Sequence, residues 1–192
     1  MGSEATKRGV GVIGAGPGVW ALHAPTLAAL SDSFRVVHIA DAGGGRAAAI
    51  ADRVGARSSG TAEELLADPE VDVVAICTPP ASHAELILAA VAAGKRAIFC
   101  EKPLATSVDE LEPVLAACAD AGVALVVGTN HLFDPAWDRV KQHLDRTGAR
   151  ILSVSAVLSL APNDRYHALV ADPVPAAAPP HRPPIDPADP GM

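Results

Sequence analysis

The sequence contains few aromatic residues, few cysteines and no basic segment. Aromatic residues make up 3% of the 192 residues, although 49% are hydrophobic. An apolar fraction supplied mainly by Ala, Val, Leu and Ile is typical of parallel sheets that helices cover on both faces. The net charge is −7, with no arginine-rich stripe. We therefore expect no nucleic-acid partner.

The cysteines and the uncharged N-terminal stretch limit where the chain is expected to act. Cys77, Cys100 and Cys118 form no CxxC pair, which is typical of reduced thiols in a cytoplasmic protein, and no metal site is predicted. Residues 9–30 carry no Asp, Glu, Lys or Arg, but they include five glycines and two prolines. Because such a segment makes a poor apolar helix, no membrane partner is expected.

Apolar runs and helix signals alternate along most of the chain. The predicted strands cover residues 9–13, 34–40, 71–76, 97–100 and 124–127, and the predicted helices cover 19–30, 43–54, 82–93, 107–121 and 135–147, with a short helix after Thr61. Short connections between strands and helices favour a doubly wound parallel sheet, a Rossmann α/β fold, in the order 3-2-1-4-5-6. We expect this domain to span residues 8–148.

The last part of the chain differs in composition. Residues 151–160 alternate apolar residues with serines, which predicts a strand. Nine of the last 32 residues are proline. A Pro-rich tail over 171–192 is expected to be disordered, since it cannot bury enough apolar surface to offset chain entropy.

A glycine-rich loop follows the first predicted strand. Gly14 permits a tight turn, and Gly16, with Pro17 and Gly18, lets a pyrophosphate approach the backbone at a helix N-terminus. Val19 stands where the GxGxxG pattern has its third glycine, and it is expected to push the helix away from the strand unless Gly18 or a one-residue shift compensates. The loop predicts a dinucleotide site.

Asp41 ends the second predicted strand. A carboxylate there can accept both ribose hydroxyls of an adenosine and repel a 2′-phosphate, which favours NAD over NADP as cofactor. It can instead cap the turn at Gly43. Arg46 is near enough in the sequence to stack on adenine or to meet a 2′-phosphate.

Two further motifs end the predicted strands 71–76 and 97–100. Thr78 and Pro79 form a rigid turn where the nicotinamide half of a cofactor would lie, and His83 either bonds a ribose hydroxyl or is an ordinary exposed residue. Glu101 and Lys102 precede a proline, so the strand aims one ammonium at the carboxyl edge of the sheet, where such folds bind ligands. A plain strand terminus is the alternative.

Together these motifs resemble the Gfo/Idh/MocA oxidoreductases over about residues 10–160. The matching segments are residues 71–80 (VDVVAICTPP), His83, residues 93–95 (AGK), 101–105 (EKPLA) and 128–130 (GTN), together with the N-terminal Gly14-Ala15-Gly16 and His23-Ala24-Pro25. The combination is far more specific than any one motif.

The resemblance implies an NAD(P)-dependent oxidoreductase acting on a sugar, a cyclitol or a related carbonyl or alcohol. Lys102 would be the proton donor or acceptor, Glu101 would orient its turn, and Asn130 would belong to the cofactor site. Residues 151–160 resemble the first strand of the family's second domain, which implies that 149–170 form a remnant of an incomplete substrate domain. That second domain also carries an Asp and a His that complete the proton relay. His167 and His181 lie in no matching motif.

Two other functions stay open at this point. The chain can be a non-catalytic dinucleotide-binding module, or an interaction module in which the strand 151–160 adds to a partner's sheet. A homo-oligomer or a complementing chain is a further expected partner.

Overall fold

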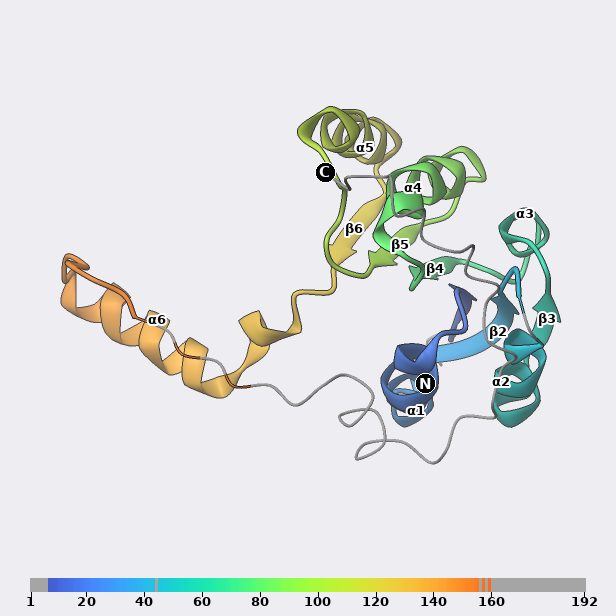
Figure 1. Ribbon diagram of the computed structural model, residues 1–192, viewed down its shortest axis with the longest axis horizontal. Helices are drawn as coiled ribbons and strands as arrows, with labels where there is room; N and C mark the ends of the chain where they lie inside the picture. Colours follow the sequence, from blue (N-terminus) through green and yellow to red (C-terminus); the bar gives the residue numbers. More distant parts are fainter. Residues whose placement is uncertain (1–6, 44, 156, 158, 160–192) are drawn as a thin grey trace, which may run out of the picture.

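The computed structural model describes residues 7–43, 45–155, 157 and 159. These residues form a six-stranded parallel sheet in the order β3-β2-β1-β4-β5-β6, which confirms the predicted Rossmann topology. The strands are β1 (Arg8–Ile13), β2 (Phe34–Ala40), β3 (Arg57–Ser59), β4 (Val73–Ile76), β5 (Ala97–Cys100) and β6 (Ala124–Val127). Figure 1 shows helices on both sides of this sheet.

The helices begin and end near the residues that the sequence predicts. They are α1 (Ala24–Ala29), α2 (Arg46–Val54), α3 (Ala62–Leu66), α4 (His83–Ala92), α5 (Val108–Ala121) and α6 (Pro135–Thr147), with shorter turns η1 (Val19–His23), η2 (Pro80–Ser82) and η3 (Asn130–Phe133). The side chains of Thr61 and Ser107 accept hydrogen bonds from amides three residues on, as the N-cap pattern requires. No helix in the described part of the chain is long and apolar enough to cross a bilayer.

Alternating strand residues build one apolar core on each face of the sheet. On one face Val74, Ile76 and Ile98 pack against α3, α4 and α5. On the other face Val12 and Ile39, among others, pack against η1, α1 and α2. Helices that precede β3 therefore cover one face of the sheet, and helices that follow β3 cover the other.

The structure differs from the predicted elements in three places. The short edge strand β3, with the sequence RSS, has no apolar pattern and was not located from the sequence. The helix predicted over 19–30 opens with the π-helical turn η1. In the range 151–160, residues 151–155, 157 and 159 are exposed. They form no strand, because their backbone pairs with none of the described strands. The rest of that range, and the predicted tail at 171–192, lie outside the described residues.

Helix α6 extends away from the sheet (Figure 1). None of its residues is buried, and Trp137 and Val140 are each 53% exposed. The sheet edge formed by β6 also exposes Val126. This end of the domain thus presents apolar side chains to solvent.

A buried polar network stabilises the amino end of the sheet. The Asp68 carboxylate accepts hydrogen bonds from His38 Nδ1 at 2.9 Å, from the Glu70 amide at 2.9 Å and from the Arg57 guanidinium. Burial alone would raise the pKa of Asp68, but these donors outweigh it and hold the pKa below its usual value. The carboxylate therefore stabilises the fold when it is ionised.

We predict that Asp68→Asn lowers the free energy of unfolding by about 2 kcal/mol at pH 7, because its donors then lose a charged acceptor. In the native protein a depressed pKa contributes stability above the unfolded-state pKa, and that stability is lost as the pH falls through the folded-state value. Urea unfolding between pH 7 and pH 3 tests this. The variant should lose less stability than the native protein over that range, and equal losses would contradict the assignment.

Candidate functional site

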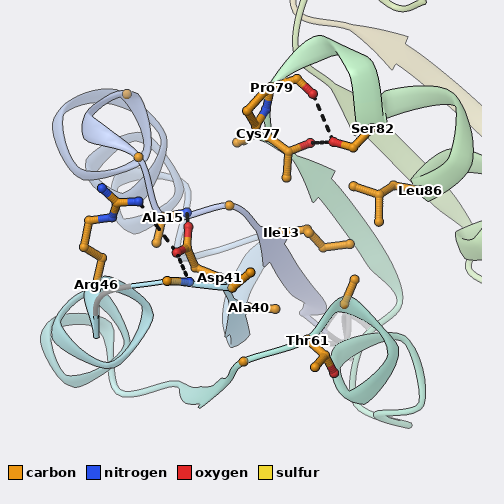
Figure 2. Close-up of a pocket in the computed structure, with 18 of the residues that line it drawn as sticks. Ile13, Ala15, Ala40, Asp41, Arg46, Thr61, Cys77, Pro79, Ser82 and Leu86 are labelled. Atoms are coloured by element: carbon orange, nitrogen blue, oxygen red, sulfur yellow. Dashed lines mark hydrogen bonds and ion pairs between the residues drawn. The ribbon is translucent and has the colours of Figure 1, made fainter. Parts of the chain in front are cut away.

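A cleft of about 890 Å³ opens at the carboxyl end of the sheet, between the turns that follow β1, β2 and β4 (Figure 2). Eight of the residues considered for the cofactor site from the sequence line it: Gly14, Gly16, Pro17, Gly18, Asp41, Arg46, Thr78 and Pro79. These residues come from three separate parts of the chain. The parallel sheet brings them together because its strands end at the same edge.

Gly14 is the residue of this loop that cannot be replaced without strain. Its φ is +100°, a backbone conformation that L side chains rarely adopt. A Cβ at this position would lie 2.6 Å from the Cys77 carbonyl oxygen. The absence of a side chain thus lets the turn after β1 approach the turn after β4.

The rest of the loop is open rather than tight. A Cβ at Gly16 or Gly18 would meet nothing within 4 Å, so the space above the backbone is free for a ligand. Val19 does not push the helix off the sheet, contrary to the expectation for a missing third glycine. It is 2% exposed and packs in the core as the first residue of the π-helical turn η1.

Asp41 is held by backbone amides on both sides (Figure 2). Its Oδ2 accepts from the Ala15 amide at 2.8 Å, and its Oδ1 accepts from the Gly43 amide at 3.0 Å. The capping role at Gly43 is therefore present, and the carboxylate still lines the cleft. Arg46 lies beside it, with a guanidinium nitrogen 3.7 Å from Oδ1.

The turn after β4 is braced by Ser82, which the sequence analysis did not single out. The Ser82 hydroxyl lies 2.8 Å from the Thr78 hydroxyl and donates to the Pro79 carbonyl at 3.0 Å. These contacts fold the turn over the start of α4 and hold Thr78 and Pro79 at the cleft wall (Figure 2).

His83 does not face the cleft, and the expectation of an exposed or ribose-binding residue needs correction. The residue is fully buried, at 0% exposure. Its Nδ1 lies 2.7 Å from the Pro103 carbonyl oxygen and its Nε2 lies 2.8 Å from the Thr78 carbonyl oxygen. Both ring nitrogens are thus used within the protein, so neither is free to bind a ligand.

Glu101, Lys102 and Asn130 lie at the same edge of the sheet but outside the cleft lining. One Glu101 oxygen accepts from the Lys102 amide at 3.1 Å, while the other lies 2.8 Å from His23 Nε2. Lys102 is exposed, and its peptide bond to Pro103 is cis. Asn130 is exposed at the start of η3. No sequence signal pairs His23 with Glu101, which stands 78 residues away.

The two thiols near the cleft are unsuited to nucleophilic chemistry. Burial, reinforced by the negative charge of Glu101, raises the pKa of both Cys77 and Cys100 to about 12. Both thiols are therefore protonated at neutral pH, as expected of packing residues.

A parallel sheet with a glycine loop, a strand-end carboxylate and an open cleft at its central crossover defines a dinucleotide-binding Rossmann domain. A family model described as "Oxidoreductase family, NAD-binding Rossmann fold" matches residues 8–129. The chain belongs to this family, the Gfo/Idh/MocA oxidoreductases.

Individual relatives agree with this assignment. Inositol 2-dehydrogenase 3 of Saccharopolyspora erythraea is 36% identical over 140 residues, which cover 72% of this chain and 41% of the relative. The crystal structure of GenD2 from gentamicin A biosynthesis, in complex with NAD, matches with a TM-score of 0.69 and 31% identity over 76% of this chain and 41% of that one. KijD10, a 3-ketoreductase from Actinomadura kijaniata crystallised with NADP and TDP-benzene, matches with a TM-score of 0.68 and 31% identity over 73% and 43%. The chain thus spans about two fifths of these proteins' length.

We predict that Gly14→Ala lowers the free energy of unfolding by about 2 kcal/mol, because the methyl group would meet the Cys77 carbonyl at a positive φ. Gly18→Ala is the matched control, since its φ is −64° and its Cβ would meet nothing. Urea unfolding should show a change within about 0.5 kcal/mol for this control. Equal losses in both variants would contradict the packing argument.

Proposed function

We propose that the chain supplies the dinucleotide site of an NAD(P)-dependent oxidoreductase that acts on a sugar, a cyclitol or a related carbonyl or alcohol. The observation that carries this proposal is the cleft in which the Gly14–Gly18 loop lies between Asp41 on one side and Thr78 and Pro79 on the other. Relatives named as inositol dehydrogenases and ketoreductases support the substrate class.

The residues of the cleft indicate which part of a dinucleotide each turn would bind. The loop over Gly14, Gly16, Pro17 and Gly18 would hold the pyrophosphate, because its backbone is uncovered and a helical segment begins there. Asp41 would accept the ribose hydroxyls on the adenosine side, while Thr78 and Pro79 would flank the nicotinamide side. Asp41 favours NAD over NADP, since its fixed negative charge opposes a 2′-phosphate.

Lys102 is the proposed proton donor or acceptor at the substrate oxygen. A bound nicotinamide would supply hydride transfer. Lys102 follows β5 directly, and β5 pairs with β4 so that Cys100 stands opposite Ile76, next to the turn that carries Thr78. Within the described residues no side chain forms an ion pair or hydrogen bond with its ammonium, which leaves the group available. Glu101 orients the turn through the Lys102 amide, and Asn130 would border the same site.

A second candidate is a non-catalytic dinucleotide-binding or interaction module. The exposed apolar residues at β6, η3 and α6 favour it, since Phe133 is 79% exposed and Trp137 is 53% exposed. A second copy or a complementing chain could cover these residues. An interaction module would bind neither NADH nor NADPH, whereas a non-catalytic dinucleotide-binding module would bind a cofactor but transfer no hydride.

We predict that the native chain binds NADH more tightly than NADPH, and that Asp41→Asn reduces this preference about tenfold because the negative charge beside the 2′ position is lost. Fluorescence titration with each cofactor measures the ratio of the two dissociation constants. Asp52→Asn, on the exposed face of α2, is the control and should leave the ratio unchanged. Tighter binding of NADPH by the native chain would overturn the assignment of Asp41.

We predict that Lys102→Ala lowers hydride-transfer rates by roughly 10²–10⁴-fold, the range expected when a general acid or base is removed. The assay follows NADH absorbance across a panel of sugars and cyclitols. Lys141→Ala, which removes an exposed lysine paired with Asp145 on α6, should retain the native rate. Equal rates for Lys102→Ala and the native chain would remove Lys102 from the mechanism.

A further inference from the structure

The buried ring of His38, on β2, contacts residues on both sides of the short helix α3. Its Nε2 lies 3.0 Å from the hydroxyl of Ser59, which ends β3 just before the helix. Its Nδ1 lies 2.9 Å from a carboxylate oxygen of Asp68, which follows the helix. The ring therefore joins the two ends of the segment that contains α3.

The first part of this segment is a wall of the cofactor cleft. Residues 60–63, which directly follow Ser59, line the cleft, and Thr61 is seen there in Figure 2. The Ser59 carbonyl oxygen also accepts a hydrogen bond from the Asp41 amide at 3.2 Å. Because Asp41 is assigned to the adenosine side of the cleft, residues 60–63 border the same half of a dinucleotide.

A neutral imidazole satisfies both contacts of the ring. The ionised Asp68 carboxylate can only accept, so the ring proton lies on Nδ1. Nε2 then offers its lone pair to the Ser59 hydroxyl, which donates. The Thr61 carbonyl oxygen, also 3.0 Å from this hydroxyl, is the alternative acceptor for the same proton. The link between His38 and Ser59 thus needs no charge on the buried ring.

These three side chains stand in the order of a Ser-His-Asp catalytic triad. Ser59 is not one of the residues that line the cleft, however, whereas the four residues after it are. We propose that His38 is a positioning residue that acts through Ser59 and holds residues 60–63 as the wall for the adenosine half of the dinucleotide. This role rests on the proposed function, whereas the contact between His38 and Ser59 does not.

Two single variants break the link from its two sides. Ser59→Ala removes the hydroxyl. In His38→Asn the amide nitrogen stands near the position of Nδ1, so it can still donate to Asp68, but nothing remains at the position of Nε2. Each variant should bind NADH about tenfold more weakly in a fluorescence titration, because the wall is no longer held in place. ADP-ribose, which lacks the nicotinamide, should lose affinity by the same factor.

The double variant tests whether the two residues act through one another. It should bind NADH about as weakly as either single variant, since one link cannot be lost twice. Additive losses, about a hundredfold in the double variant, would overturn the proposal. A loss in Ser59→Ala without one in His38→Asn would assign the effect to the Thr61 contact and would also overturn it.

Val114→Ala is the control for a general loss of stability. Val114 is fully buried on α5 and does not line the cleft. Its truncation should lower the melting temperature but leave the affinity for NADH unchanged. An equal loss of affinity in this control would show that binding follows stability alone, which would contradict a positioning role.

Hydrogen exchange by mass spectrometry on the full chain reads the link without any cofactor. Exchange over residues 59–64 should be about tenfold faster in both single variants than in the native chain, while exchange over α5 stays unchanged. Unchanged exchange over 59–64 in His38→Asn would overturn the link. If the native chain binds neither NADH nor NADPH, the proposed function fails, and the exchange result still decides whether His38 holds this segment.

Discussion

The structure depends on the parallel pairing of β1 with β4 at the centre of the sheet. Ile13 stands opposite Ile76, so both strands end at the same level. The chain after β1 then turns to one face of the sheet and the chain after β4 turns to the other. This divergence opens the cleft, and the close approach of Gly14 to the Cys77 carbonyl sets how near the two turns can lie.

Polar side chains connect the other turns along this edge. Asp41 joins the end of β2 to the loop after β1 by accepting from the Ala15 amide. His83 joins the turn after β4 to the turn after β5, and His23 joins the first helical turn to Glu101. Each link uses a side chain to join segments that follow different strands of the sheet.

Much of this arrangement could be predicted from the sequence, because local signals determine it. The strand β5 is a short apolar run, Ser107 caps α5, and the glycine loop follows β1, so local signals predict the topology. The glycine loop, Asp41 and Thr78 were expected at one edge of the sheet, and all three line the cleft. The short strand β3 was missed because its three residues, Arg57 to Ser59, have no apolar pattern and depend on pairing with β2.

Long-range contacts explain the other differences. His83 looks like an exposed residue at the start of a helix, and only the fold shows that the turn after β5 covers it. The same holds for His23 and Glu101, whose contact joins segments far apart in the chain. Sequence spacing predicts which elements form, whereas contacts between turns require the complete sheet.

The two lysines at the ends of β5 differ in burial and in contacts. Lys95, before the strand, is buried and donates to the carbonyl oxygens of Asp68 and Val71, both at 3.0 Å. Burial lowers the pKa of Lys95, although the carboxylates of Asp68 and Asp72 oppose this effect. Lys102, after the strand, is exposed at the edge where the cleft opens. At the amino edge the ammonium binds two backbone carbonyl oxygens and holds the fold together, whereas at the carboxyl edge the lysine is exposed to solvent.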